Sequence, residues 1–413
     1  MRVAIDAVGI RDFGGAVLLD QLIGWLPRAR PDWEWKLYLL PHRERRFEDP
    51  APNQQVSVES IAYGGSALTR LYWIYRDFPQ RAARWGADVV LAFANIGVGR
   101  PDIAQVIYCH QPLAILPESA GTQSFPDMLR MRVLRSLVCR GMRSSRAVVV
   151  QTRAMKHRLA ELVSGVEQRI HVIPGGCRAG SRTPHIRPQK RDLIDNLEQP
   201  WLLYVAQPVP HKNHLMLLHA LPLIVQWFPE IRLVLTVDPP ETAGRRQPAG
   251  YAGQIHHVVR VLGLRDSVVF AGTLTPDEVH YALSLASMLV FPSLAESFGL
   301  PLAEAMGAGC PVAASDLSYA REIVGEAGAY FNPEDPSAIA FTVTALLDQP
   351  GRLRQLSELA AGRKHRFEYP RIAERLARVL EQAAGAGAHR PGPRPGEQER
   401  VISCVESQAS LER

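Results

Sequence analysis

The sequence predicts an α/β protein of two Rossmann-like domains, each built on a parallel sheet, that face each other across a cleft. Its 413 residues exceed what a single core usually fills, so two domains are expected. Short β-branched runs alternate with longer amphipathic stretches, and this alternation implies parallel sheets covered by helices on both faces. The apolar fraction of 46% and the charged fraction of 21% are those of an ordinary globular protein.

The expected strands fall into two series. The first series lies at residues 3–8, 36–40, 89–93, 105–108, 147–151 and 171–173, and the second at residues 201–206, 232–237, 268–271, 288–291 and 311–314. Amphipathic helices are expected between them, for example at residues 216–227 and 279–287. In doubly wound sheets ligands bind beyond the carboxyl ends of the strands, so the loops that follow strands are where chemistry is expected.

The boundary between the domains is expected in RAGSRTPHIRPQKRDLIDNLEQP, which mixes proline, glycine, serine and charge with little apolar periodicity. This gives a first domain at residues 1–178, a linker at 179–200 and a second domain at 201–366. A last amphipathic helix is expected within residues 367–383. Residues 384–413 are rich in glycine and proline, which predicts a disordered tail.

Composition narrows the class of protein. The formal charge of +6 favours an anionic partner, and no recognition motif accompanies it that would indicate nucleic acid. Five cysteines without a C-x-x-C pair predict free thiols in a reducing compartment. The first residues run directly into a strand pattern, and no stretch approaches the roughly 20 apolar residues of a membrane span. A cytoplasmic protein is therefore expected.

The strongest motif is FPSLAESFGLPLAEAMGAGCPVAASD, in which a strand ends and a helix begins near Gly299. The free backbone N–H groups at a helix N-terminus suit a diphosphate. Carboxylates on both sides of an anion site fit a ligand with phosphate at its centre and hydroxyls at both ends, such as a nucleotide sugar. The residues concerned are Glu296, Ser297, Phe298, Gly299, Leu300 and Glu304.

A second motif, LLYVAQPVPHKNHLMLLHAL, is expected to form a strand, a tight turn and a helix. Lys212 stands at the mouth of this turn, where a lysine supplies a point charge for phosphate, with a solvated surface lysine as the alternative. Gln207, at the strand end, can donate a hydrogen bond but carries no charge. Asn213 is expected to cap the following helix.

Two weaker signals follow strands of the first domain. Gly14 and Gly15 would let the backbone come close to a ligand, although a pair of glycines is more often a simple turn. His110 emerges at a strand end, where a satisfied loop histidine is the alternative to a functional one.

The spacing Glu296-x7-Glu304 within ESFGLPLAEAMGAGCPV resembles the signature of the family 4 retaining glycosyltransferases, which have the GT-B fold. The likeness continues into DLSYAREIVGEAGAYFNPEDPSAIA and VIPGG, and weaker likeness covers residues 1 to about 383. The resemblance implies an acceptor-binding first domain, a nucleotide-sugar-binding second domain, and a final helix that crosses back to the first domain.

The resemblance also implies roles for single residues. Glu296 would face the hydroxyls of the transferred sugar, Glu304 the ribose, and Lys212 the diphosphate. Gln207 departs from the family pattern, in which arginine is usual, so a neighbouring base such as His211 or an arginine of the other domain would have to compensate. Gly14 and Gly15 resemble the glycine loop beside the phosphate and acceptor. His110 resembles the histidine under the donor sugar. Gln111 is assigned no role.

The implied function is a retaining glycosyltransferase that moves a sugar from a nucleotide diphosphate sugar to a glycan or lipid-linked acceptor in bacterial surface polysaccharide synthesis. The sequence has neither a D-x-D motif for a divalent metal nor a G-x-x-x-x-G-K-[ST] loop, so metal-independent catalysis without a cofactor is expected. An inactive GT-B carbohydrate-binding or assembly subunit and a nucleotide-sugar epimerase are the alternatives.

Two basic segments, at residues 66–85 and 129–146, combine arginines with apolar and aromatic residues. Basic amphipathic helices suit an anionic membrane face, where lipid-linked acceptors reside, and a location at the inner face of the cell membrane would follow. Two solvated, arginine-rich helices are the alternative of equal weight.

Overall fold

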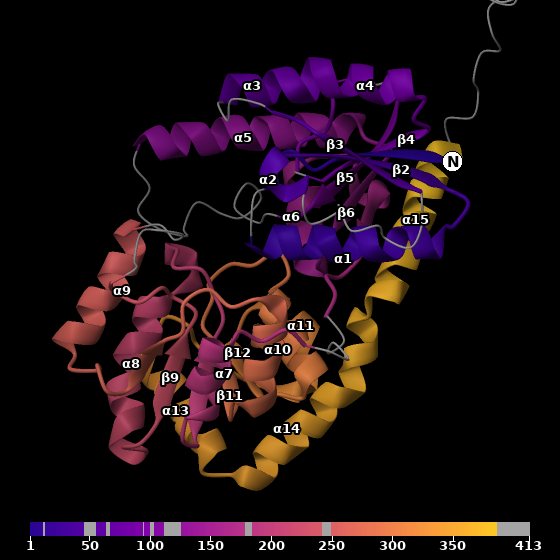
Figure 1. The fold of residues 1–413 in the computed structure, drawn as a ribbon. Coiled ribbons are helices and arrows are strands. Elements are labelled where there is room, and N and C mark those ends of the chain that lie inside the picture. The colour runs from indigo at the N-terminus through magenta and orange to yellow at the C-terminus, as the bar shows by residue number, and fades with distance from the viewer. Residues whose placement is uncertain are drawn as a thin grey trace, which may run out of the picture.

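The computed structural model describes residues 1–10, 13–44, 55–62, 67–93, 95–99, 103–110, 125–177, 184–241 and 249–385. They form two lobes, each built on one parallel sheet (Figure 1). The predicted α/β class with two parallel sheets is confirmed. Residues 179–183 of the predicted linker, residues 386–413 of the predicted tail and Gln111 lie outside the described residues.

The first domain has a seven-stranded sheet in the order β3-β2-β1-β4-β5-β6-β7, in which every neighbouring pair is parallel. Its strands are β1 (Arg2–Asp6), β2 (Glu34–Leu39), β3 (Val56–Ser60), β4 (Val89–Ala92), β5 (Ala104–Cys109), β6 (Ala147–Val150) and β7 (Ile170–Val172). Its helices are α1 (Phe13–Ala29), α2 (Pro41–Glu44), α3 (Ala67–Tyr72), α4 (Phe78–Trp85), α5 (Phe125–Ser144) and α6 (Arg153–Leu162), with a π-helical turn, Trp73–Asp77, joining α3 to α4.

The second domain has a six-stranded sheet in the order β10-β9-β8-β11-β12-β13, again parallel throughout. Its strands are β8 (Trp201–Tyr204), β9 (Arg232–Leu235), β10 (Val268–Phe270), β11 (Met288–Phe291), β12 (Val312–Ser315) and β13 (Gly328–Phe331). Its helices are α7 (Pro188–Asp195), α8 (His214–Trp227), α9 (Ala249–Val261), α10 (Pro276–Leu285), α11 (Leu300–Ala308), α12 (Ser318–Val324), α13 (Pro336–Leu347) and α14 (Pro350–Arg363).

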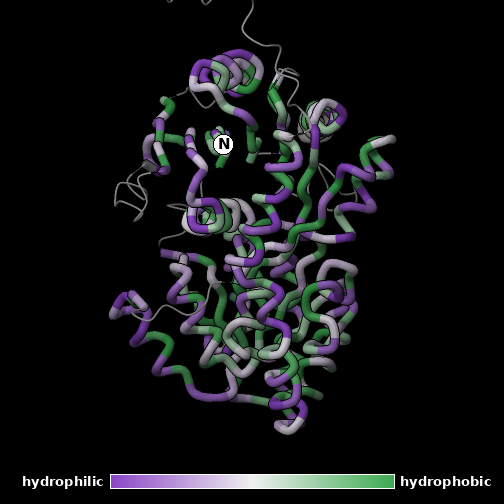
Figure 2. The backbone as a smooth tube through the Cα atoms, turned by 90° about the vertical axis from the view of Figure 1, so that its right-hand side faces the viewer, coloured by the Kyte–Doolittle hydropathy of each residue, from purple (hydrophilic) through white to green (hydrophobic). Residues whose placement is uncertain are grey.

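The last helix, α15 (Tyr369–Gly385), leaves the second domain and packs on the first, beside α1 and the strands β4 and β5 (Figure 1). Ile372, Leu376 and Leu380 of this helix are fully buried in the same core as α1. The π-helical turn Trp73–Asp77 and helices α4 to α6 cover the opposite face of the first sheet in a separate core. Along the helices, hydrophobic stretches alternate with hydrophilic ones, as expected of helices that bury one face (Figure 2).

The strands missing from the prediction are β3 and β13, and both are edge strands. The side chains of β3 are half-buried or exposed, and β13 begins with glycine and has two half-buried residues among its four. An edge strand packs against fewer neighbours, so its sequence need not carry the continuous apolar run by which an interior strand of a parallel sheet is recognised.

The predicted linker contains helix α7, which the sequence analysis did not anticipate. Its apolar content is small, but Ile194 is buried in the core of the second domain. The predicted tail also begins two residues early, because Ala384 and Gly385 still belong to α15. No helix in the described parts of the chain is both long enough and apolar enough to cross a membrane.

Candidate active site

A cavity of about 480 Å³ lies between the two domains and is lined by residues of both. All of the predicted site residues line it. They are Gly14, Gly15 and His110 of the first domain, and Gln207, Lys212, Glu296, Ser297, Phe298, Gly299, Leu300 and Glu304 of the second. The structure therefore gathers into one place four motifs that are far apart in the sequence.

The wall of the second domain is formed by the loop between β11 and α11. Gly299 has a φ of +87°, a left-handed conformation that glycine adopts without strain, and it sets the direction of the helix that follows. Pro301 lies in the first turn, and Gly309, with a φ of +71°, ends the helix. The N-terminus of α11 thus faces the cavity, and Glu304 follows one turn inside the helix.

Lys212 and Glu296 form an ion pair across this wall, with 2.5 Å between Nζ and Oε1. Only 18% of the lysine side chain and 8% of the glutamate side chain is exposed. Lys212 comes from the turn before α8, and the turn is tied to the β11 loop because the backbone N–H of Leu294 donates to the carbonyl of His211 at 2.8 Å. The two motifs are thereby held in register.

The wall of the first domain is formed by the start of α1 and the end of β5. A Cβ atom built on Gly15 would lie 3.2 Å from the ring of His110, and one on Gly14 would lie 3.5 Å from Leu300 of the other domain. The distance at Gly15 is tighter than most Cβ contacts, so glycine there favours the close approach of α1 to the histidine, whereas the distance at Gly14 is an ordinary van der Waals contact. The backbone N–H of His110 donates to the side chain of Asn95 at 2.8 Å, and Phe93 stacks on its ring.

The family of the chain can be read from both domains. The model of Glycosyltransferase Family 4 matches residues 14–179, and that of Glycosyl transferases group 1 matches residues 199–349. The chain belongs to the family 4 glycosyltransferases. The resemblance inferred from the spacing of Glu296 and Glu304 is confirmed.

Relatives of this family 4 glycosyltransferase extend the comparison. A phosphatidyl-myo-inositol mannosyltransferase of Mycolicibacterium smegmatis is 31% identical over 180 residues, which are 43% of this chain and 44% of that protein. The chain therefore matches less than half the length of this curated relative. Sucrose-phosphate synthase from Thermosynechococcus elongatus has a TM-score of 0.73 at 19% identity, covering 94% of this chain and 100% of that one. Anabaena HepE in complex with UDP-glucose has a TM-score of 0.69 at 17% identity, covering 92% and 100%. The structural likeness shows the GT-B fold.

Three histidines at or near the cavity of this glycosyltransferase have low pKa values. Burial lowers the pKa of His110 to about 4. Burial, together with the charge of Lys212, lowers the pKa of His211 to about 4 and that of His214 to about 3. All three are therefore neutral at neutral pH. Without a ligand, His211 therefore does not supply the positive charge that Gln207 lacks.

No arginine is among the described residues that line the cavity. Gln207 does line the cavity, and its Nε2 is buried without a hydrogen-bond partner. Such an atom is costly unless a ligand satisfies it. Positive charge at this wall comes from Lys212 and from the N-terminus of α11.

Two polar cavity residues were not singled out from the sequence, namely Gln151 and Thr236. Each follows a strand, which is the signal that would have found them. Asn213 differs from prediction in another way. It holds the N-cap position of α8 with a φ of +61°, but its side chain donates to the carbonyls of Pro292 and Pro333 instead of capping the helix.

Among the described residues no group of three or more histidine, cysteine, aspartate and glutamate side chains is arranged to hold a metal ion.

Residues of the two domains contact each other directly beside the cavity. Thr152 Oγ1 donates to the carbonyl of Ser297 at 3.3 Å, and a Cβ atom on Gly175 would lie 2.6 Å from the ring of Phe298. The diphosphate-binding loop predicted from the sequence is therefore packed against the first domain.

Proposed function

We propose that this protein transfers a sugar from a nucleoside diphosphate sugar to a glycan or lipid-linked acceptor. The observation that carries the proposal is the meeting of Lys212, the N-terminus of α11, Glu296 and Glu304 in one cavity between two domains. A cation and a helix N-terminus suit a diphosphate, and carboxylates suit the hydroxyls of sugars. A nucleoside diphosphate sugar carries these groups in one molecule.

The order of the strands gives the donor a direction. The α11 loop follows β11, Gln207 follows β8, Thr236 follows β9 and Thr273 follows β10, and these strands are neighbours in that order. Three spacings between strands amount to roughly 14 Å, which leaves room for a nucleoside beside the diphosphate. The nucleoside would lie toward β9 and β10, and the sugar toward Glu296 and His110.

In the proposed reaction the bond between the anomeric carbon and the diphosphate oxygen breaks, and the oxygen of the acceptor hydroxyl bonds to the same carbon. The proton of that hydroxyl passes to the leaving diphosphate. Retention of configuration is what the resemblance to the family implies. Lys212 and the N-terminus of α11 stabilise the negative charge that develops on the leaving diphosphate, without a metal ion or another cofactor. His110, neutral because burial lowers its pKa to about 4, orients a sugar hydroxyl and does not act as a cation.

The acceptor would enter from the first domain, whose α1 and β5 complete the cavity. A lipid-linked or polysaccharide acceptor at the cytoplasmic face of a bacterial membrane fits the relative named as a phosphatidyl-myo-inositol mannosyltransferase. We propose on this basis that the reaction belongs to the synthesis of surface glycans.

Contact with the membrane would use the segment of α3 and α4. Leu68 is 79% exposed and Tyr72, one turn later, is 64% exposed, while the arginines Arg76 and Arg84 are also exposed. Trp73 and Ile74 are buried, so only part of the apolar content of this segment faces outward. The charge-reversing double variant Arg76→Glu, Arg84→Glu should lose binding to vesicles that contain phosphatidylglycerol, and Arg352→Glu on α14 is the control. Binding unchanged in the double variant would favour two merely solvated helices.

The donor site is tested by thermal stabilisation with UDP, GDP, ADP and CMP in the presence of a chelator. The preferred nucleotide should stabilise the fold by about 2.7 kcal/mol at 100 times its dissociation constant. Lys212→Ala should abolish the effect. The matching nucleotide sugars would then be assayed for release of nucleoside diphosphate with a glycan acceptor. No stabilisation by any nucleotide would favour an inactive carbohydrate-binding subunit.

A further inference from the structure

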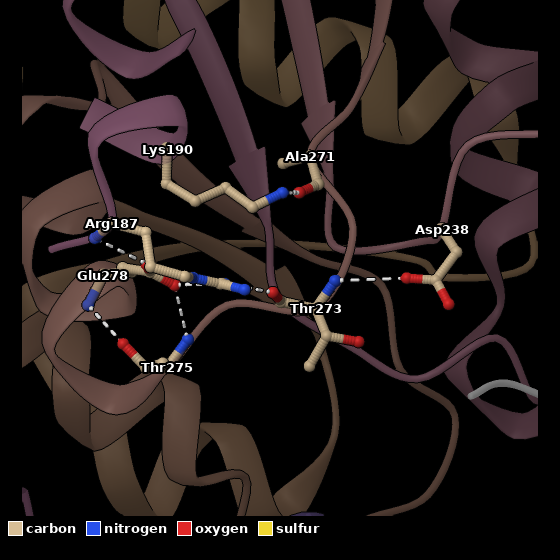
Figure 3. Close-up of polar contacts among 7 residues, drawn as sticks. All are labelled: Arg187, Lys190, Asp238, Ala271, Thr273, Thr275 and Glu278. Atoms are coloured by element: carbon tan, nitrogen blue, oxygen red, sulfur yellow. Dashed lines mark hydrogen bonds and ion pairs between the residues drawn. The ribbon is translucent and has the colours of Figure 1, made fainter. Parts of the chain in front are cut away.

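A network of charged groups lies behind the wall of the cavity that would face the nucleoside (Figure 3). At its centre the guanidinium of Arg187 donates from Nε to Oε1 of Glu278 at 2.7 Å and from Nη2 to Oε2 at 2.6 Å. The same Nη2 also donates to the carbonyl of Thr273 at 2.8 Å. Arg187 precedes α7, in the segment that joins the two domains, so a residue outside the cavity reaches one of its loops.

Glu278 needs Arg187 as the counter-ion of its carboxylate. It is fully buried, and it also accepts the backbone N–H groups of Arg187 at 3.1 Å and of Thr275 at 2.8 Å, the latter as part of the capping box of α10. Burial by itself raises the pKa of Glu278, but these hydrogen bonds outweigh it and lower the pKa to about 2. A buried carboxylate that loses its cation is strongly destabilised, so the loop depends on Arg187 for its position.

The loop between β10 and α10 is held at several points. Arg187 holds the carbonyl of Thr273, the carboxylate of Asp238 accepts its backbone N–H at 3.3 Å, and Lys190 of α7 donates to the carbonyl of Ala271. Figure 3 shows Lys190 and Arg187 reaching this loop from the same side, with Asp238 on the other. The backbone of Thr273 is therefore fixed on both sides.

The side chain of Thr273, in contrast, is not satisfied by the protein. Its Oγ1 is buried without a hydrogen-bond partner, and the residue lines the cavity together with Leu274 and Pro276. Buried hydroxyls almost always have a partner, so this one points to a group supplied by a ligand. The loop lies across β8 and β9 from the α11 loop, which is the side of the cavity away from the diphosphate.

We propose that Arg187 is a positioning residue for the nucleoside half of the donor. It fixes the backbone of Thr273 so that the Thr273 hydroxyl meets the nucleoside, while the diphosphate is held elsewhere by Lys212. This inference rests on the proposed donor site. It also assigns a task to the segment between the domains, which joins them and shapes the cavity at the same time.

The experiment compares two probes, the preferred nucleoside diphosphate and inorganic pyrophosphate, by isothermal titration calorimetry. Arg187→Ala should weaken the binding of the nucleoside diphosphate by about tenfold or more and leave the affinity for pyrophosphate unchanged. Arg187→Lys should restore part of the loss. Arg191→Ala is the matched control, because Arg191 is an exposed arginine of α7 that stacks on Tyr281 of α10 and does not reach the Thr273 loop. Lys212→Ala should weaken the binding of both probes.

Thr273→Val keeps the shape of the side chain and removes its hydroxyl, so it serves if Arg187→Ala fails to fold. This variant should bind the nucleoside diphosphate about threefold to tenfold more weakly and bind pyrophosphate with unchanged affinity. Wild-type affinity in Thr273→Val, or equal losses for both probes in Arg187→Ala, would overturn the inference and leave the donor site standing. A wild-type protein that binds no nucleoside diphosphate would overturn both proposals.

Discussion

At the scale of single residues, the candidate catalytic side chains are held by partners within the protein. Glu296 is paired with Lys212, and His110 is fixed through Asn95 and Phe93. A geometry that is fixed in this way does not have to be organised during the reaction, which is the condition under which electrostatic stabilisation is most effective.

Glu296→Gln should retain the fold and lower the rate of sugar transfer by about 10²-fold or more, because the variant loses the carboxylate that we propose faces the sugar. The measurement is nucleoside diphosphate release together with the midpoint of urea unfolding. Glu358→Gln, at an exposed position of α14, is the matched control. Full activity in Glu296→Gln would remove Glu296 from the catalytic site.

The buried histidines predict how stability depends on pH. Burial lowers the pKa of His110 to about 4 and of His214 to about 3, whereas histidine in the unfolded chain titrates near 6.5. As pH falls below about 6.5, these histidines become protonated in the unfolded state but stay neutral in the folded state. The free energy of unfolding therefore falls by up to about 1.4 kcal/mol per pH unit for each histidine.

Urea unfolding between pH 7 and pH 5 measures this loss in a range above the titration of most carboxylates. His214→Asn should make the dependence on pH shallower, and His219→Asn, at an exposed position of the same helix, should not. Equal unfolding midpoints at pH 7 and pH 5 in the wild-type protein would contradict the prediction.

At the scale of elements, close approaches of the backbone decide how the last helix joins the first domain. A Cβ atom on Gly176 would lie 2.6 to 2.7 Å from the ring of Tyr369, the first residue of α15, and the backbone N–H of Cys177 donates to the carbonyl of Phe367 at 2.8 Å. The chain after β7 and the start of α15 therefore fit only if residue 176 has no side chain.

Gly176→Ala should lower the free energy of unfolding by about 1 to 3 kcal/mol, because its methyl group overlaps a buried ring. Denaturant unfolding measures the change. Gly362→Ala is the control, because a Cβ atom there meets nothing within 4 Å and the residue lies inside helix α14. A Gly176→Ala protein as stable as the wild type would show that Tyr369 can move aside.

The elements also show what could be predicted from the sequence. Interior strands such as β1 and β11 are buried on both faces, so their apolar runs are visible in the chain. The edge strands β3 and β13 and the small helix α7 bury too little to leave such a pattern. The residues of the α11 loop were found because a helix start and its glycines are local features. The support of the Thr273 backbone by Arg187 and the neutral state of His211 were missed because they depend on residues brought near by folding.

At the scale of the whole molecule, the two domains are joined by more than the chain itself. Both carboxylate oxygens of Glu322 in the second domain accept the backbone N–H of Arg153 at the start of α6, at 3.0 and 2.8 Å. Thr152, the residue before Arg153, donates a hydrogen bond to the carbonyl of Ser297. Helix α15 also spans the boundary, because it follows the second domain in the chain and packs into the core of the first. The domains should therefore unfold together.

Glu322→Ala should remove about 1 kcal/mol from the contact between the domains, since the carboxylate sits at a helix N-terminus. Differential scanning calorimetry should then show a broader or divided transition. Glu358→Ala provides the control on the same domain. A single transition identical to that of the wild type would mean that the other contacts suffice.

The ion pair between Lys212 and Glu296 has a consequence for which molecules the cavity accepts. Free phosphate, pyrophosphate and nucleotides without a sugar can take the lysine only by leaving a largely buried carboxylate without its cation. A nucleotide sugar brings hydroxyl donors that satisfy the carboxylate as its diphosphate takes the lysine. These sugar-free anions should therefore still bind, but more weakly than a nucleotide sugar, which replaces both halves of the ion pair at once.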